Sequence, residues 1–468
     1  MNEENTYDCA IIGGGLSGIA AAIRLSHFGI KTVLLEKNAN LGGLNTFYYK
    51  NKIEIDSGLH AMTNFSQKGG SKHLPLHKLL RQLRINYDEL KLIEHLQSEV
   101  RFPQKSIVFD NDFSKTKESF KKNFPQSADG LDKLCEFISK YDAFSLDQAS
   151  TGNSALKKIS EFINDETLTG MILLPLMYYG NSEENDMDLS QFIIMFRSVF
   201  MEGFCRPSDG IRCVINLLEN KLKENSCEIR RRAAVSKIVH DGKLLKIVLS
   251  DGTSLNTVKI ISCAGANETL RLCDPTPSIT NPDGRMAFVE AIFCMKDKFD
   301  TGEYKNACLF FNDKTKLNYV SPKEAFNIES GVLCCPHNFK YLESEKPERK
   351  FLRLTARANS QSWINVSEEK YSKLKDEFRE AAFAKIADLS GLKISNDDVS
   401  FGDIFTPRTI QKWSGHSNGA IYGSPHKIKN GETEIKNLFI CGTDQGFLGI
   451  TGSILSGISI ANKYALNT

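Results

Sequence analysis

The chain has 468 residues, a formal net charge of +2 and 41% hydrophobic residues, which is enough length for two or three domains with a large core. The balanced charge gives no support for nucleic-acid binding, and the first residues, MNEENTYD, are too polar for a signal peptide. No run of about 18 apolar residues predicts a membrane-spanning helix. The 12 cysteines follow no disulfide or zinc spacing, which favours reduced thiols in a cytoplasmic protein.

The N-terminal segment 7–36 predicts a strand, a glycine turn, a helix and a second strand. Gly13, Gly15 and Gly18 lie between the first strand and the helix. In this motif the first glycine allows a tight turn, the second lets a pyrophosphate approach the backbone, and the third lets the helix pack closely on the strand. The amide groups at the helix start favour phosphate charge, and Glu36 can accept hydrogen bonds from an adenosine ribose. This context predicts dinucleotide binding.

A second glycine pair follows at Gly42 and Gly43, within a segment that begins at Lys37. Such a pair brings the backbone close to a flat or charged group, and flavoproteins of the two-dinucleotide type use it beside the phosphates and the ring. The segment 53–60 then alternates like a strand and ends in a glycine turn with His60. His60 is either a hydrogen-bonded structural histidine or a residue beside the flavin.

Residues 66–160 change in character, since helical patterns rich in Lys and Glu predict an inserted domain. The segment 165–204 is the most apolar part of the chain. It contains Tyr178 and Tyr179, followed by a predicted helix from about 189 to 204 whose apolar stripe is wider than an ordinary amphipathic face. The segment is either a buried core helix, or else the wall of a long lipophilic pocket or an entry from a membrane surface.

The chain then predicts a helix from 211 and a group of strands over 227–265 that returns to the nucleotide domain. Residues 275–395 predict mixed strands and a charged helix. A strand over 437–441 ends at Gly442 and Asp444, and the last helix covers 454–464. Trp413 and Tyr422 lie in the segment before this strand, where each is either a core residue or a residue of the site.

These motifs resemble the phytoene desaturase-like branch of the flavin amine oxidase superfamily, which includes carotenoid desaturases, carotenoid isomerases and retinol saturases. The matching segments are 13–43, 56–60, 209–211, 235–264, 406–423 and 442–452. The resemblance implies non-covalent FAD held by Gly13, Gly15, Gly18, Glu36, Lys37, Gly42, Gly43, Leu44, Val235, Gly442, Asp444 and Gly452. In this assignment Asp444 bonds the ribityl chain or a phosphate-linked water, unless it only caps a helix. The helix that starts near Gly452 points its amino end at the flavin.

The fold that follows is α/β, with a discontinuous Rossmann-like FAD-binding domain of the two-dinucleotide type and an inserted mixed α+β substrate domain. We expect the FAD-binding domain to comprise 1–65, 205–275 and 396–468. The substrate-binding domain then comprises 66–204 and 276–395.

The implied function is an FAD-dependent oxidoreductase that desaturates, saturates or isomerises C–C bonds of a lipophilic polyene or isoprenoid through hydride transfer. We expect Tyr178, Tyr179, Phe196 and Phe200 to line its substrate pocket. No Ser/His/Asp set or metal cluster is visible, so the positional candidates for catalysis are His60, Trp413 and Tyr422.

Two alternatives remain open. One is an amine or amino-acid oxidase on the same scaffold, although Gly452-Ser453-Ile454 stands where that family often has an aromatic residue. The other is a non-catalytic flavin-binding accessory protein. A lipophilic substrate would also favour peripheral contact with a membrane. The substrate, the direction of electron flow and the oligomeric state are left undetermined.

Overall fold

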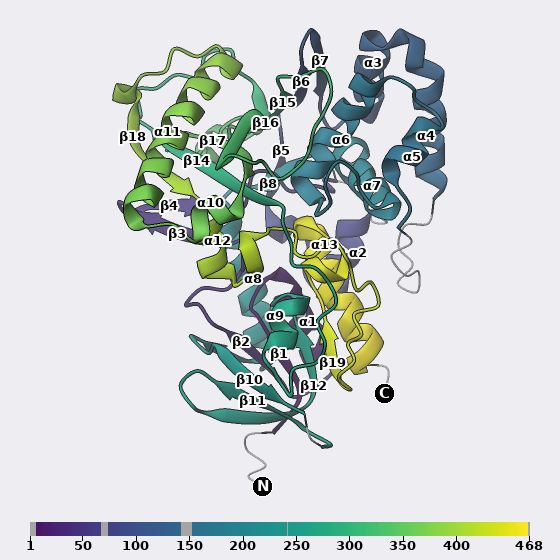
Figure 1. Cartoon of the computed structure of the whole chain (residues 1–468), viewed down its shortest axis with the longest axis vertical. Coiled ribbons are helices and arrows are strands. Elements are labelled where there is room, and N and C mark those ends of the chain that lie inside the picture. The colour runs from purple at the N-terminus through teal and green to yellow at the C-terminus, as the bar shows by residue number, and fades with distance from the viewer. Residues whose placement is uncertain (1–5, 67–73, 142–151, 241, 467–468) are drawn as a thin grey trace.

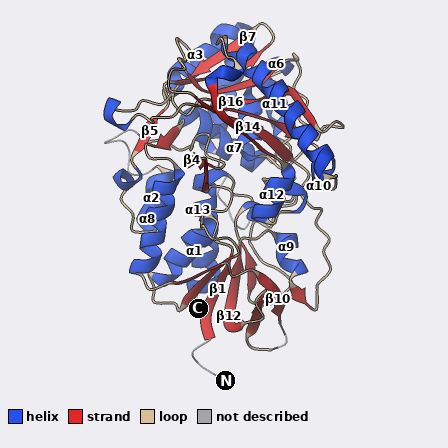
Figure 2. Cartoon of the chain, turned by 90° about the vertical axis from the view of Figure 1, so that its left-hand side faces the viewer, coloured by secondary structure: helices blue, strands red, loops and turns tan. Residues whose placement is uncertain are grey.

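The structure is a computed structural model that describes residues 6–66, 74–141, 152–240 and 242–466. Its strands form two large sheets, which lie at opposite ends of the molecule in Figures 1 and 2. A group of helices lies beside the second sheet, in the upper right of Figure 1. Within the described ranges, no helix combines the length and the hydropathy that a bilayer crossing needs.

The first sheet combines strands from the N-terminal, middle and C-terminal parts of the chain. Its strands are β1 (Thr6–Ile12), β2 (Thr32–Glu36), β9 (Glu228–Arg231), β10 (Val235–Val239), β11 (Leu245–Leu249), β12 (Ser254–Ser262), β13 (Cys273–Asp274) and β19 (Leu438–Ile440). They lie in the order β13-β10-β11-β12-β1-β2-β9, and β19 also pairs with β12. β1 is parallel to β2 and β12, and all of β2 is buried, as expected for apolar strands covered on both faces.

Helices cover this sheet. They are α1 (Leu16–Ser26), α2 (Pro75–Gln82), α8 (Ile211–Glu224), α9 (Ala266–Arg271) and α13 (Gly449–Ile460). The N-terminal α1 packs directly on the C-terminal α13, and Gly457 makes this approach possible, because a Cβ there would lie 2.0 Å from the Ser17 carbonyl oxygen. A helix near the N-terminus and a helix near the C-terminus therefore meet beside the glycine turn.

The second sheet is mostly antiparallel. Its strands are β6 (Gln97–Phe102), β7 (Lys105–Phe109), β14 (Ala287–Met295), β15 (Asn306–Asn312), β16 (Phe326–Cys334), β17 (Phe351–Ala358) and β18 (Val399–Phe405). They lie in the order β18-β14-β17-β16-β15-β6-β7. α11 (Glu368–Ser390) packs on one face through Phe378, Ala382 and Ile386. The other face contributes Phe288, Phe310 and Val332 to a core shared with the helical group.

The helical group comprises α3 (Phe113–Asn123), α4 (Ala128–Lys140), α5 (Ala155–Ser160), α6 (Glu166–Gly180) and α7 (Leu189–Phe196). A π-helical turn, Arg197–Met201, continues α7, so the helix expected over 189–204 ends slightly earlier. Smaller elements are the pairs β3 (Phe47–Lys50) with β4 (Ile53–Asp56) and β5 (Leu92–Glu94) with β8 (Cys205–Pro207), and the helices α10 (Ser360–Ile364) and α12 (Pro407–Ser414).

One helix and one strand lie outside the domains to which the sequence assigned them. We expected 66–204 in the substrate-binding domain, but Leu76, Leu79 and Leu80 of α2 belong to the core of the first sheet. We expected 396–468 in the FAD-binding domain, but β18 pairs with β14 at the edge of the second sheet. Its Phe401 packs with Ile292 and Cys294 of β14. The strand has no motif of its own, and its place is set by this pairing across more than a hundred residues.

Candidate functional site

A cavity of about 1230 Å³ is lined by the glycine turn of the first sheet, by the second sheet and by α6 and α7. It is larger than the pockets that enclose a typical drug-sized ligand. Its lining includes the positions expected to hold a dinucleotide and also apolar residues of the helical group. The cavity therefore has room for a cofactor and a substrate together.

The glycine turn has the shape that a pyrophosphate needs. Gly13 has φ of +97°, and a Cβ at Gly18 would lie 2.1 Å from the Gly13 carbonyl oxygen, so neither position accepts a larger residue easily. A Cβ at Gly15 would meet no atom within 4 Å, because this position faces the cavity. Gly15 is also the N-cap of α1, where free amide groups attract phosphate.

Glu36 lines the cavity at the end of β2 and holds the surrounding loops. Its Oε2 accepts a hydrogen bond of 2.7 Å from the Gly14 amide, and its Oε1 accepts one of 2.7 Å from the Asn38 amide. Each carboxylate oxygen can accept a further bond, so ribose hydroxyls can still donate to Glu36. The neighbouring Lys37 also lines the cavity, and burial lowers the pKa of its ammonium group.

The remaining expected cofactor positions also line the cavity, with one exception. They are Gly42, Gly43, Leu44, Val235, Gly442 and Gly452. Gly42 donates to the Gly14 carbonyl oxygen at 2.8 Å, which places the second glycine pair beside the first. Thr451, at the start of α13, lines the cavity with a buried hydroxyl that has no hydrogen-bond partner among the described residues. An orphaned polar atom of this kind fits a polar edge of a bound ligand.

The exception is Asp444, which the structure places behind the cavity wall. Its carboxylate accepts hydrogen bonds from the amides of Ala266 at 2.6 Å and Ser424 at 2.8 Å. The ammonium group of Lys427 lies 4.0 Å away. Asp444 is 2% exposed and does not line the cavity, and its carboxylate joins three loops. Its contact with a ribityl chain or a phosphate-linked water stays a prediction.

The four expected pocket residues divide into two pairs. Tyr178 and Tyr179 line the cavity, but Phe196 and Phe200 belong to the closed core beside it. Phe196 packs on Phe113 and Phe192, and Phe200 packs on Phe109 and Phe120. The pocket prediction for these two residues is wrong, because the phenylalanine stripe of α7 faces α3 and β7. A different face of α7 and of its π-helical turn lines the cavity, with Ile194, Met195, Arg197 and Ser198, and Glu202 follows directly after the turn.

The three candidates for catalysis also have different surroundings. His60 lines the cavity, and its Nε2 lies 2.7 Å from Glu290 Oε1. Tyr422 lines it as well, but its hydroxyl donates to the Tyr178 carbonyl oxygen at 2.6 Å. Trp413 lies at the cavity with 55% of its surface exposed. His60 is therefore the candidate with a charged partner.

Several polar residues of the cavity wall were not predicted from the sequence. Glu290 lies in the middle of β14, where the sequence AFVEAIFCM is otherwise apolar, and a lone acid in a buried strand was a usable signal. Asn64 and Glu202 form a second polar group, because Asn64 Nδ2 donates to Glu202 Oε2 at 3.0 Å and to Ser198 Oγ at 3.2 Å. Burial raises the pKa of Glu202. Ser198 and Glu202 are four residues apart in the chain, but no spacing in the sequence connects them with Asn64.

Known proteins of similar sequence are enzymes of carotenoid and retinol chemistry. The chain is 24% identical to a 4,4'-diaponeurosporene oxygenase of Staphylococcus haemolyticus, over 88% of this chain and 86% of that protein. It is 21% identical to a prolycopene isomerase of an Oncidium hybrid, over 99% of this chain and 85% of that protein. It is also 21% identical to an all-trans-retinol 13,14-reductase of Danio rerio, over 97% of this chain and 86% of that protein.

Solved structures show the same α/β fold, which confirms the predicted fold class. An oxidoreductase from Methanosarcina mazei superposes with a TM-score of 0.66 at 17% identity, over 97% of this chain and all of that one. Putrescine oxidase superposes with a TM-score of 0.65 at 14% identity, over 99% of both chains.

A family model described as flavin containing amine oxidoreductase matches residues 16–294, more than half of the chain. The matched region includes Gly18, Glu36 and the second glycine pair, all of which border the cavity or its turn. The chain therefore belongs to the flavin containing amine oxidoreductases and is an FAD-dependent oxidoreductase.

Proposed function

We propose that this oxidoreductase desaturates, saturates or isomerises C–C bonds of a lipophilic polyene or isoprenoid. The observation that carries the proposal is the apolar wall that α6, α7 and the second sheet add to the cavity. Its residues are Tyr178, Tyr179, Ile194, Met195, Phe288 and Val332, and Ile421 and Tyr422 of the loop after α12 extend it. Burying a hydrocarbon on such a wall gains about 25 cal/mol per Å² of apolar surface, so a substrate with few polar groups can bind.

The residues of the chain supply binding and orientation. Gly15 and the start of α1 fit the pyrophosphate, Glu36 fits the adenosine ribose, and Thr451 offers a hydroxyl at the start of α13. FAD bound there would supply hydride transfer. The apolar wall excludes water and holds the substrate at a fixed distance from the cofactor. We also propose that FAD is bound without a covalent link, which acid precipitation tests by releasing the flavin into the supernatant.

An amine substrate is the second candidate, and one observation favours it. Glu202 places a carboxyl group on the cavity wall beside Asn64 and Ser198, where an ammonium group could pair with it. The similar fold of putrescine oxidase agrees with this alternative. The apolar lining and the names of the relatives favour the polyene, since an amine oxidase would not need so extended a hydrocarbon surface.

Anaerobic half-reactions of the FAD-loaded protein distinguish the two candidates. The oxidised and the photoreduced enzyme would each be mixed with a carotenoid hydrocarbon, with all-trans-retinol and with putrescine, and flavin absorbance would be followed. We expect a polyene either to reduce the oxidised flavin or to oxidise the reduced flavin. If the reaction is an isomerisation, the polyene should change while the flavin redox state does not. Reduction by putrescine alone would replace the polyene proposal with amine oxidation.

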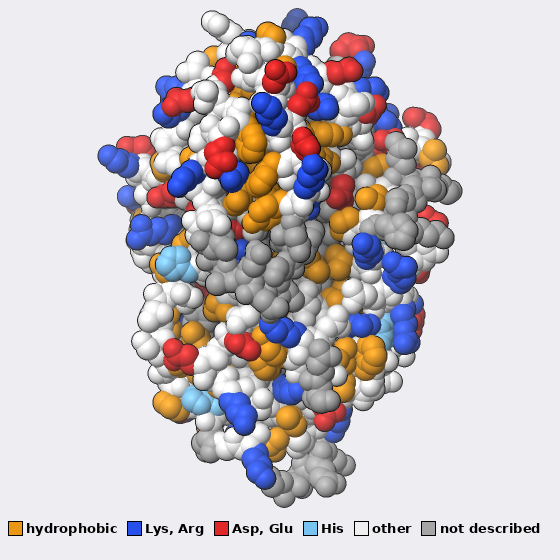
Figure 3. All heavy atoms as spheres, turned by 90° about the vertical axis from the view of Figure 1, so that its right-hand side faces the viewer, with side chains coloured by type: hydrophobic (Ala, Val, Ile, Leu, Met, Phe, Trp, Pro, Cys, Tyr) orange, Lys and Arg blue, Asp and Glu red, His pale blue; other side chains and the backbone are white. Residues whose placement is uncertain are grey.

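We also propose that the protein meets its substrate at a membrane surface. On the face shown in Figure 3, hydrophobic side chains are exposed in the upper middle and again in the lower half, among interspersed acidic and basic side chains. Flotation with neutral and anionic liposomes tests the contact. Recovery of all the protein in the bottom fraction with both lipids would overturn it.

A further inference from the structure

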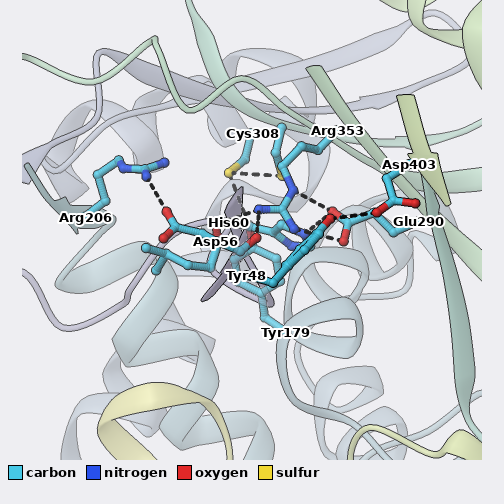
Figure 4. A network of polar contacts seen from close by, with 11 residues as sticks. Tyr48, Asp56, His60, Tyr179, Arg206, Glu290, Cys308, Arg353 and Asp403 are labelled. Atoms are coloured by element: carbon cyan, nitrogen blue, oxygen red, sulfur yellow. Dashed lines mark hydrogen bonds and ion pairs between the residues drawn. The ribbon is translucent and has the colours of Figure 1, made fainter. Parts of the chain in front are cut away.

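A buried ion pair in the second sheet touches the cavity at Glu290. The Arg353 guanidinium, on the neighbouring β17, donates from Nε to Glu290 Oε1 at 2.8 Å and from Nη2 to Glu290 Oε2 at 2.9 Å. Arg353 is 3% exposed, and its Nη1 donates to the carbonyl oxygens of Asp56 at 3.0 Å and Leu59 at 3.4 Å. One arginine thus fixes both the carboxylate and the turn that carries His60 (Figure 4).

His60 completes this group from the other side. Its Nε2 lies 2.7 Å from Glu290 Oε1. Burial alone would raise the pKa of Glu290, but the nearby charges of Arg353 and His60 hold it well below its usual value. The carboxylate is therefore a permanent acceptor, so His60 must donate its Nε2–H to it.

The other ring nitrogen of His60, Nδ1, is available to a ligand in the cavity. Nδ1 has no hydrogen-bond partner among the described residues, and the ring lines the cavity. Because Glu290 holds the Nε2–H tautomer, a neutral His60 presents a lone pair at Nδ1 and a protonated His60 presents a proton there. The arrangement matches the way a buried carboxylate orients a catalytic histidine in other enzymes.

The other groups around His60 are neutral or already paired. The Tyr179 ring of α6 lies 6.2 Å from the His60 ring, and its hydroxyl lies 3.2 Å from the Cys308 sulfur, with burial raising the pKa of the phenol. Cys334 follows Cys308 at 3.9 Å, and burial raises its pKa as well.

The nearby acids have partners of their own (Figure 4). Asp56 accepts from Arg206 at 2.9 Å and from the Ile211 amide at 2.9 Å, and Asp403 accepts from the Tyr48 hydroxyl and pairs with Lys50. The Glu290–Arg353 pair therefore dominates the charge around His60.

We propose that His60 is the proton donor and acceptor of the reaction, with Glu290 and Arg353 as positioning residues. The proposal rests on the proposed C–C chemistry. In saturation, one carbon of a C=C bond receives a hydride from reduced FAD, and the adjacent carbon receives the Nδ1 proton of protonated His60. Two C–H bonds replace the π bond, FAD is left oxidised, and His60 regains its proton from solvent. Desaturation is the reverse, with the hydride going to oxidised FAD and the proton going to neutral His60.

The test measures the anaerobic half-reaction of the FAD-loaded protein over a range of pH, with the polyene that the wild type accepts. General acid–base catalysis contributes about 100-fold to 10,000-fold, so His60→Gln should lower the rate constant by about 100-fold or more and remove one inflection of the pH profile. Substrate affinity and FAD content should not change. In D₂O the saturating wild type should place one deuterium at the protonated carbon.

Glu290→Gln tests the positioning role. Losing the carboxylate destabilises the protonated imidazole, so the same inflection should move to lower pH while the variant still turns over. His240→Gln is the matched control, because His240 lies in the β10–β11 hairpin away from the cavity and its ring bonds the Pro275 carbonyl oxygen. A His60→Gln rate within about threefold of the wild type, with the same pH profile, would overturn the proposal.

A second measurement separates this proposal from the proposed function. Long-range ¹H–¹⁵N spectra of histidine-labelled protein report the tautomer of each ring, and His60→Gln assigns the signal. We expect the Nε2–H tautomer in the wild type, even if none of the polyene probes reacts. An Nδ1–H tautomer would refute the assignment of His60 whichever substrate is correct.

Discussion

Gly15 and Gly18 lie three residues apart in one turn, yet an added methyl group would meet very different surroundings. At Gly15 it would enter the cavity, whereas at Gly18 it would lie 2.1 Å from the Gly13 carbonyl oxygen and 2.7 Å from the Cys263 sulfur. Gly15 therefore leaves space for a ligand, and Gly18 allows the close packing of the helix on the strand. Both are conspicuous in the sequence, but only the surrounding atoms separate the two roles.

Gly15→Val should abolish FAD binding without unfolding the chain, because its side chain would occupy the place of the pyrophosphate. Gly18→Ala should lower the free energy of unfolding by about 1–3 kcal/mol through overpacking. Flavin content and urea unfolding of the two apoproteins measure the difference. Equal FAD content in Gly15→Val and the wild type would reject the cofactor role of this turn.

The ion pair of Glu290 predicts a dependence of stability on pH. The pKa of Glu290 lies well below the 4.5 of a free glutamate, so the folded state binds its proton less readily than the unfolded state. This contribution is complete above about pH 4.5 and is lost as the pH falls below it. Between about pH 5 and about pH 3, the free energy of unfolding should therefore fall less in Glu290→Gln than in the wild type. Urea unfolding of both proteins at these two pH values measures the difference. Parallel losses in both proteins would show that other acids dominate.

α7 and its π-helical turn serve two regions at once. Phe196 and Phe200 pack into the core with aromatic residues of α3 and β7, while Ile194 and Met195 line the cavity. The sequence left two interpretations of this helix open, a buried core helix and a pocket wall. The structure shows both, on different faces of the helix. A π-helical turn often marks a functional site, because it shifts the direction of the side chains that follow.

The two faces of α7 should respond differently to truncation. Phe196→Ala should lower the free energy of unfolding by about 3–5 kcal/mol, as large core truncations do, with little change in polyene affinity. Ile194→Ala should cost less stability and change the affinity more, because its side chain lines the cavity. Urea unfolding and fluorescence titration with all-trans-retinol measure both quantities. The reverse order would place the pocket on the phenylalanine stripe.

The molecule as a whole holds its cofactor site between segments that are far apart in the chain. Gly15, Val235, Gly442 and Gly452 all line one cavity, and α1 packs on α13 beside it. The cavity also meets the second sheet at Glu290 and Thr355. A ligand that fills it therefore contacts both sheets.

FAD should stabilise the chain by about 2.7 kcal/mol at a concentration one hundred times its dissociation constant. Its binding should protect amides of residues 13–18 and of 442–452 from hydrogen exchange at the same time, since both segments border one site. Thermal unfolding and exchange with mass spectrometry test this expectation. Protection of residues 13–18 alone would mean that the C-terminal segment does not contact FAD.

Local sequence was enough to predict the nucleotide end of the site. The turn around Gly15, the acid at Glu36 and the second glycine pair are short-range patterns, and backbone geometry connects each of them to its role. The amine oxidase-like α/β fold followed from the order of these motifs along the chain. The helices near 211, 368 and 454 also lie close to where their periodicity placed them.

Other features depended on contacts between residues distant in the chain. The direction in which Phe196 points, the place of β18 and the pairing of Asp444 with Ala266 and Ser424 are set by packing between segments that are not adjacent in the chain. The ion pair of Glu290 with Arg353, and its contact with His60, joins three segments that no spacing connects. The sequence by itself determined which cofactor chemistry this protein can support. Only the tertiary structure decided which side chains face that chemistry, because burial and hydrogen bonding act through space.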